Sequence, residues 1–342
     1  LAGTKRKAKI HIHVDEPETV FDAAREYGEV SAQKADDMHR QQHATHGDKQ
    51  RFAVIVDSAA DITDDDMERH DIHMVPCRIQ FGEHGYLDKV GITIDEFYSE
   101  LESNPHHPST SQPSPGDFRR QFQFLASHFD DVISINVMSG ASGTYDAACL
   151  AASRTDAHGK VHVIDSRNGS MGQGQLAVLA AECAEAGLDV ERTVAVVEAQ
   201  VPQTTSYIIL KDLRYAVRGG RLPAWVKTIA DMLRLTPIIY TTHEGKLGLS
   251  SFLFGRANWI ERFARHIARR APAGPVEIGI GHAICAEDAV ALEQYLHKLL
   301  PDIRKSRISG VSPAIGVHGG PGTLLVAVKP WLSAQDIADS TD

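Results

Sequence analysis

The sequence predicts an α/β protein of two domains, one built on a mostly parallel sheet and a smaller one of the α+β class. Short apolar runs such as residues 52–56, FAVIV, have the length and composition of strands that are buried on both faces. These runs alternate with helical patterns along residues 51–165, an order typical of parallel sheets. The alternation is less regular along residues 166–332, which favours a mixed sheet there, with a cleft between the domains.

The elements of the first domain follow from hydrophobic spacing and from residues that begin helices. Thr93 is a helix N-cap residue, and Ser114, Pro115 and Asp117 supply a cap, a proline and an acid at the start of another helix. Strands are predicted at residues 52–56, 72–81, 132–137 and 161–165. Helices are predicted at residues 63–70, 93–101, 117–129 and 144–154.

The second domain begins with two helical patterns and continues with strands that do not alternate strictly with helices. Helices are predicted at residues 175–186, 190–200, 259–269 and 287–299. Strands are predicted at residues 206–210, 236–241, 247–254, 276–282, 307–311 and 324–328.

Residues 1–50 differ in character from the rest of the chain. A strand-like run at residues 10–14 and a helix at 17–27 precede a polar, His- and Gln-rich passage at 31–50, which is expected to be a helix leading into a linker. Residue 1 is a leucine close to this strand, so the chain is expected to begin inside a larger domain. We therefore predict that residues 1–46 are the C-terminal remnant of another domain plus a linker.

Composition excludes several classes of function. The formal net charge of −10 over 342 residues argues against a nucleic-acid partner, whose phosphates need a basic surface. No apolar run approaches the roughly 20 residues of a membrane span and no signal peptide is present, so a cytoplasmic protein is expected. The 4 cysteines form no CxxC pair and are expected to be core thiols.

Four short loops rich in hydroxyl groups and glycine are expected at the ends of strands, where α/β proteins bind ligands. Their N–H groups and hydroxyls can hold an anion, and two arginines in one loop can bind a carboxylate, a phosphate or an acidic partner. A purely structural role, as helix caps or solvated surface, stays open for each loop. The loops are STSQPSPGDF at 109–118, SGASGT at 139–144, RGGR at 218–221 and HGGPGT at 318–323.

Several catalytic motifs are absent from the sequence. There is no G-x-x-x-x-G-K-[ST] phosphate-binding loop, and G-A-S-G around Ser142 is one residue short of the G-x-S-x-G nucleophile elbow. The glycines at 172 and 174 lack the third glycine of a dinucleotide-binding turn. Neutral donors and one imidazole remain, which suit a site that holds a carboxylate without a nucleophile of its own.

These loops, in this order, resemble the DegV family, whose members bind a long-chain fatty acid. The resemblance covers residues 52–330 and implies a DegV-like fold of two domains with a lipid tunnel between them. The matching segments are VIVDSAAD at 54–61, TSQPSPGDF at 110–118, SGASGTYDAA at 139–148, VHVIDSRNGSMGQG at 161–174, VRGGRL at 217–222 and HGGPG at 318–322.

The resemblance also implies roles for individual residues. The hydrocarbon tail is expected in the tunnel, and the acyl carboxylate is expected at Thr110, Ser111, Ser142 and His318. The supporting loops contribute Ser139, Gly143, Thr144, Gly319 and Gly320. The chain departs from many relatives, which carry threonine, serine and serine, respectively, at Gly319, Pro223 and Ala147.

Residues 7–43 resemble the end of the middle domain of fatty-acid kinase subunits related to dihydroxyacetone kinase. In that family an H-x-H pair on a strand can belong to a metal site, and His11 and His13 would point to one face of a strand. Two ligands do not complete a metal site, so a strand with polar faces is the preferred interpretation.

Together the two resemblances imply a fusion of a kinase-type protein with its acyl-binding partner. The chain would carry no cofactor, since ATP and Mg²⁺ belong to a kinase domain, for which Arg218 and Arg221 are contact candidates. It would present the bound fatty acid for phosphorylation to an acyl phosphate in phospholipid metabolism, with a transient contact to a membrane surface. Whether the chain is itself an enzyme stays open, and a non-catalytic fatty-acid-binding component of a fatty acid kinase is the preferred interpretation. The alternatives are a serine-dependent lipid hydrolase or acyl transferase using Ser142 and His318, and a lipid-sensing regulatory module.

Overall fold

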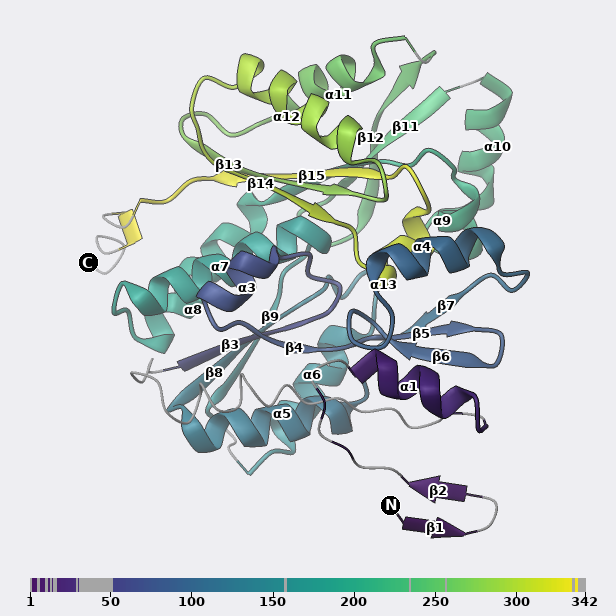
Figure 1. Ribbon diagram of the computed structural model, residues 1–342. Helices are drawn as coiled ribbons and strands as arrows, with labels where there is room; N and C mark the ends of the chain where they lie inside the picture. Colours follow the sequence, from purple (N-terminus) through teal and green to yellow (C-terminus); the bar gives the residue numbers. More distant parts are fainter. Residues whose placement is uncertain are drawn as a thin grey trace.

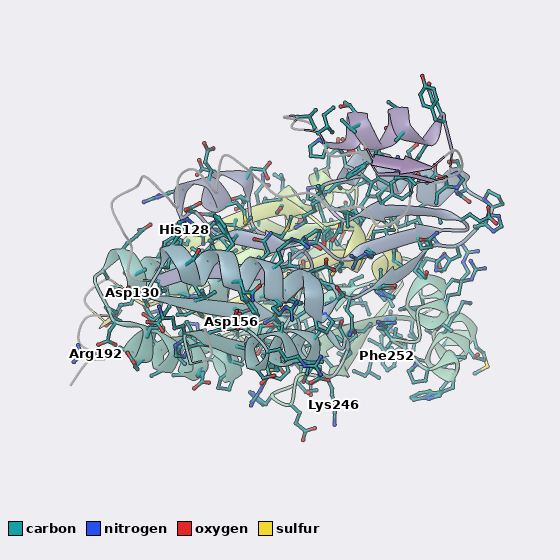
Figure 2. All side chains as sticks on the ribbon, turned by 90° about the horizontal axis from the view of Figure 1, so that it is seen from below. His128, Asp130, Asp156, Arg192, Lys246 and Phe252 are labelled. Atoms are coloured by element: carbon teal, nitrogen blue, oxygen red, sulfur yellow. The ribbon has the colours of Figure 1, made fainter. Side chains whose placement is uncertain are left out.

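The computed structural model describes residues 2–4, 7–9, 12, 14, 17–28, 30, 52–156, 159–233, 235–255, 257–333 and 336–337. In this part of the chain, two large sheets lie one above the other with helices between them and on their outer faces (Figure 1). Exposed charged residues such as Asp130, Asp156, Arg192 and Lys246 project from the surface (Figure 2). None of the described helices is long and apolar enough to span a membrane.

The lower sheet is fully parallel and has the strand order β4-β3-β8-β9. Its strands are β3 (Phe52–Asp57), β4 (His73–Val75), β8 (Asp131–Asn136) and β9 (Val161–Asp165). One face packs on α5 (Pro115–His128) and α6 (Thr144–Ser153), and the other on α7 (Ser170–Glu185) and α8 (Val190–Gln200). Both faces are therefore buried, as the continuous apolar runs predict.

The upper sheet is mixed and has the strand order β12-β11-β10-β15-β13-β14. Its strands are β10 (Thr205–Ile209), β11 (Leu235–Thr241), β12 (Leu247–Phe254), β13 (Val276–His282), β14 (Ile303–Gly310) and β15 (Leu324–Pro330). Helices α11 (Trp259–Ala268) and α12 (Ala286–Leu299) cover its outer face. The α/β class is confirmed. Because α7 packs against both sheets, the domain boundary at residue 165 stays a prediction.

A third, small antiparallel sheet lies beside the parallel sheet and has the order β6-β5-β7. Its strands are β5 (Arg78–Phe81), β6 (His84–Leu87) and β7 (Ser109–Ser111). The prediction of one strand over residues 72–81 is wrong, because Pro76 cannot donate to a ladder and the chain passes there from β4 into another sheet. The loop at 109–118 also begins as a strand rather than as a coil.

Several helices were not predicted, or begin earlier than predicted. Helix α7 starts at Ser170 rather than at residue 175, because its first turns contain the glycines of SMGQG. Helices α9 (Arg214–Arg218), α10 (Ala224–Leu233) and α13 (Pro313–Gly319) were not predicted. The segment around residue 318 is therefore the end of a helix and not only a loop.

Buried charged residues join helix α3 (Asp64–Arg69) to the mixed sheet. Arg307 Nε donates to Asp66 Oδ2 at 2.5 Å, and its Nη1 donates to Glu277. Lys329 Nζ lies 2.9 Å from Glu277 Oε2, with both side chains at least 97% buried. A large buried ion network of this kind depends on every partner being present.

The N-terminal region contributes a hairpin, β1 (Ala2–Thr4) with β2 (Lys7–Lys9), and helix α1 (Pro17–Arg25). Helix α1 lies against the β5–β6 hairpin (Figure 1). The Arg25 guanidinium is there 4.3 Å from the centre of the Tyr86 ring. In the predicted strand at 10–14, Ile12 and Val14 have no regular structure and the other three residues lie outside the described part. Residues 31–50 also lie outside the described part.

Candidate functional site

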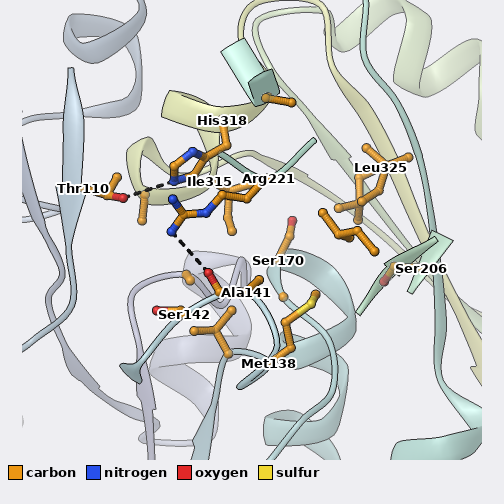
Figure 3. Close-up of a pocket in the computed structure, with 18 of the residues that line it drawn as sticks. Thr110, Met138, Ala141, Ser142, Ser170, Ser206, Arg221, Ile315, His318 and Leu325 are labelled. Carbon is orange, nitrogen blue, oxygen red and sulfur yellow. Dashed lines mark hydrogen bonds between the residues drawn. The ribbon is translucent and has the colours of Figure 1, made fainter. Parts of the chain in front are cut away.

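A cavity of about 140 Å³ lies between the loops of the parallel sheet and the inner face of the mixed sheet. Its walls come from β7, the loop at 139–144, the start of α7, strands β10, β11 and β15, and helix α13 (Figure 3). One end is polar and the rest is mostly apolar. Among its described lining residues, Arg221 is the one with a fixed formal charge.

The polar end brings together residues that are far apart in sequence. Thr110 Oγ1 lies 3.1 Å from His318 Nε2, although 208 positions separate them (Figure 3). Thr110 is held on β7 by its pairing with Ile79 of β5, and His318 stands in the last turn of α13. Ser111 and Ser142 line the same end of the cavity.

In the loop at 139–144, some hydroxyl groups face the cavity and one is bonded to another part of the protein. Ser142 Oγ lies 2.8 Å from Thr144 Oγ1 and accepts a hydrogen bond from Thr144 N at 3.3 Å. Ser139 Oγ instead donates to Asp165 Oδ2 at 2.6 Å, which fixes the loop to the end of β9. Ser142 and Thr144 therefore face the cavity, whereas Ser139 has a structural partner.

His318 is mostly buried, and its imidazole is neutral at pH 7. Burial, the positive charge of Arg221 and the nearby His107 together lower its pKa from 6.5 to about 4, with burial as the largest cause. Its Nδ1 atom is buried without a hydrogen-bond partner among the described residues. Gly219 packs on this nitrogen so closely that a Cβ atom would lie 2.1 Å away, which explains the first glycine of RGGR.

Two buried aspartates of the VIVDSAAD segment set the positions of the surrounding elements. The Asp57 carboxylate accepts from Val137 N at 2.8 Å and from Gln173 Nε2 at 3.0 Å, which ties β3 to the end of β8 and to α7. Asp61 accepts from Ser312 N at 3.0 Å and thereby holds the start of α13, the helix that carries His318. The two aspartates therefore hold in place the elements that carry the site.

Arg221 lies at the mouth of the cavity and links its two rims. Its Nη2 donates to Ala141 O at 3.2 Å (Figure 3). Its Nη1 donates to Gly219 O at 2.5 Å. The mouth opens into a polar vestibule that is lined by Gln112, Ser139, Gly143, Asp146 and Arg221, together with residues of the polar end. Arg218, at the end of α9, is exposed and does not line the cavity.

The apolar wall was missed in the sequence, although strand alternation could have indicated it. Ser206, Ile208 and Leu210 face the cavity, whereas Tyr207 and Ile209 pack in the core under α11 and α12. Gly319 also lines the cavity, and Gly320 ends α13 with a φ of +73°. Gln112, Met138, Ala141 and Ile315 were missed as well, since nothing in their local sequence distinguishes them.

The geometry argues against a serine hydrolase. No hydrogen bond joins Ser142 to His318 in the described structure, because Ser142 is bonded to Thr144 and His318 Nε2 to Thr110. A catalytic base also needs an acid at its second nitrogen, and His318 Nδ1 faces Gly219 instead. The arrangement offers neutral donors to an anionic group and an apolar space behind it.

The metal prediction is not tested, because His11 and His13 lie outside the described residues. Among the residues that are described, no group of three or more histidine, cysteine or acidic side chains could hold a metal ion.

The chain is similar to known proteins over most of its length. Residues 51–330 match the family described as "Uncharacterised protein, DegV family", and residues 1–45 match a fatty acid kinase-like middle domain. A DegV domain-containing protein of Caldanaerobacter subterraneus is 32% identical over 279 residues, 80% of this chain and 96% of the relative. Protein DegV of Bacillus subtilis is 30% identical over 275 residues, 80% and 97% of the two chains.

Solved structures share the fold. The structure of DegV from Bacillus subtilis, described as a fatty acid binding protein, is 28% identical, with a TM-score of 0.73 over 83% of this chain and 100% of that chain. A DegV family protein from Thermus thermophilus, at 24% identity, gives a TM-score of 0.75 over 82% and 100% of the two chains. Over residues 51–330, the chain therefore belongs to the DegV family.

Proposed function

We propose that the protein binds a long-chain fatty acid, with the tail in the cavity and the carboxylate at Thr110, Ser111, Ser142 and His318. The observation that carries this proposal is the division of one cavity into a small polar end and a larger apolar part. An amphiphile with a compact anionic head fits such a division. The related Bacillus subtilis protein, described as a fatty acid binding protein, supports the same ligand.

The tail supplies most of the affinity. Each buried methylene contributes about 0.8 kcal/mol, so a palmitoyl tail contributes on the order of 10 kcal/mol before the cost of ordering it. The head group then needs only directional donors, which Thr110, Ser142 and a neutral His318 supply. A carboxylate held by neutral donors keeps its charge available for reaction.

The reaction is phosphorylation by a dihydroxyacetone-kinase-like domain, to which the chain presents the carboxylate. A carboxylate oxygen attacks the γ-phosphorus of ATP, the bond to the β-phosphate oxygen breaks, and acyl phosphate and ADP result. ATP and Mg²⁺ are held by the kinase domain. Two features support this step: the similarity of residues 1–45 to a kinase middle domain, and the vestibule that places Arg221 beside the head-group end.

Acyl phosphate formation tests the presentation step. The complete protein, or this chain with a dihydroxyacetone-kinase-like partner, is incubated with oleate and Mg-ATP, and acyl phosphate is trapped with hydroxylamine. Arg221→Ala should spare oleate binding and abolish the hydroxamate, and Arg218→Ala tests the second candidate contact. Equal hydroxamate from wild type and Arg221→Ala would remove Arg221 from the phosphorylation step.

A transient membrane contact at α10 completes the proposal. Trp225, Met232 and Leu233 of α10 are 60%, 72% and 54% exposed. The opposite side of the helix buries Ala230 against Leu210 and Ile239, which line the cavity. Helix α10 thus separates the cavity from an apolar outer face. Trp225→Ser with Met232→Ser should reduce sedimentation with phosphatidylcholine vesicles, and unchanged sedimentation would refute the contact.

A further inference from the structure

The cavity has a definite direction, which follows from the register of the strands that form its wall. Ile208 of β10 pairs with Ile239 of β11 and with Leu325 of β15, and all three side chains line the cavity. Towards the head-group end the wall continues with Leu210 and Thr323, and Thr323 lies against Gly319, beside His318. An acyl chain whose carboxylate lies at His318 would therefore extend along the strands, away from His318.

Away from the head-group end, the wall changes from apolar to polar at the next row, that is, at the next set of inward-facing residues that pair across the strands. The next inward-facing positions are Ser206 on β10 and Thr241 on β11, which are 1% and 5% exposed and line the cavity. Ser206 lies on the opposite side of the cavity from Thr110 (Figure 3). Neither Ser206 nor Thr241 belongs to the proposed head-group site.

These hydroxyl groups are bonded to each other and to a buried amide behind them. Ser206 Oγ donates to Asn168 Oδ1 at 2.8 Å, and Thr241 Oγ1 donates to the same atom at 3.1 Å. Thr241 Oγ1 also accepts from Ser206 N at 2.9 Å. Their hydroxyl protons are committed within this cluster, so the cluster presents no free donor to a second polar group of a ligand.

Beyond Ser206 and Thr241, the described neighbours of the cavity are polar or tightly packed. The Asn168 amide donates to Thr204 O at 2.9 Å, and Lys329, two residues beyond Ala327 of the same row, is 2% exposed and paired with Glu277. On the side of α7, Gly172 packs so tightly that a Cβ atom would lie 2.8 Å from Ser206 Oγ. A hydrocarbon chain that continued there would have to break buried hydrogen bonds, which costs free energy.

We propose that Ser206, Thr241 and Asn168 form a floor at which the methyl end of the acyl chain stops, so that these residues select the chain length. The inference rests on the proposed binding of a fatty acid and adds what limits the ligand. Because the floor is rigid and fully bonded, a chain one methylene too long cannot be accommodated by a small rearrangement. A shorter chain leaves apolar space unfilled and binds more weakly.

A competition among saturated acids tests the floor. The delipidated chain is incubated with an equimolar series from lauric to arachidic acid, and the bound acids are extracted and quantified by mass spectrometry. Thr241→Ser removes a methyl group from the floor and should shift the preference towards longer acids. Each additional methylene that becomes buried should change the ratio of neighbouring acids about fourfold.

Two further variants complete the test. Ser206→Val fills the end of the cavity and should shift the preference towards shorter acids. Thr236→Ser, on the same strand but outside the cavity lining, is the matched control and should leave the profile unchanged. If Ser206→Val does not fold, as judged by circular dichroism, the Thr241→Ser profile decides the question.

The outcomes separate this inference from the function on which it rests. Opposite shifts in the two floor variants, with an unchanged control, support the floor. A wild-type protein that binds acids, with the same profile in Thr241→Ser, overturns the floor and leaves fatty-acid binding intact. A wild-type protein that takes up no acid of the series overturns both.

Discussion

The hydroxyl group of Thr110 offers a sharp test of the head-group site. Thr110→Val keeps the β-branched shape that suits strand β7 and removes the oxygen that lies 3.1 Å from His318 Nε2. The bound carboxylate then loses one hydrogen bond to a charged acceptor, worth about 1.5–3 kcal/mol. The affinity for palmitate should fall about 10- to 150-fold.

Displacement of a fluorescent fatty acid from the delipidated chain measures this loss. Ser109→Ala, on the same strand but exposed and outside the cavity, is the matched control and should bind palmitate like the wild type. Methyl palmitate provides a second comparison, because its ester carries no charge for Thr110 to stabilise. Thr110→Val should weaken the ester much less than the acid. An equal loss for acid and ester, or no loss for either, would refute the placement of the carboxylate.

Three further predictions concern pH, buried charge and close packing. Because the pKa of His318 is about 4 in the folded chain and 6.5 when exposed, only the unfolded chain takes up its proton as pH falls between these values. This should remove on the order of 3 kcal/mol of stability below pH 4. Urea titrations should show the free energy of unfolding falling as the pH is lowered, and His318→Asn should flatten this dependence. Arg307→Met removes the guanidinium that contacts both Asp66 and Glu277, and should lower the free energy of unfolding by about 3–5 kcal/mol. A loss below about 1 kcal/mol would contradict the network. Gly219→Ala places a methyl group 2.1 Å from His318 Nδ1, so oleate affinity should fall while the circular dichroism spectrum is retained, and unchanged affinity would argue against this packing.

Much of the fold could be predicted because its local signals agree with the tertiary structure. Strand β12 at 247–254, strand β13 at 276–282 and helix α8 at 190–200 have the predicted bounds. Thr93 and Ser114 both form capping boxes, as their sequence contexts indicate. Hydrophobic spacing and caps are properties of a short segment and need no knowledge of its neighbours.

The elements that were not predicted are those whose local structure depends on residues far away in the sequence. The glycines in the first turns of α7 oppose a helix locally, yet Gly174 is required because a Cβ atom there would lie 2.5 Å from Asp61 O. Helix α13 is short and glycine-rich, and its first turn is held by Asp61, 251 positions away from Ser312. No local pattern records such contacts.

The head-group site was predicted from a family resemblance rather than from spacing. Thr110 and His318 belong to β7 and α13, and only the packing of the small sheet against α13 brings them within 3.1 Å. The floor at Ser206 and Thr241 was not predicted, because two hydroxyl residues on separate strands give no signal until the strand register is known.

Native mass spectrometry of the purified chain, before and after denaturing extraction, tests the central claim most directly. We predict one fatty acid for each chain, released by extraction and identifiable as a free acid. The delipidated chain should then take up added palmitate or oleate to the same ratio. A chain that is empty as purified and also binds neither acid would contradict the account, and the hydroxyl groups at the polar end would then need another anion or a purely structural explanation.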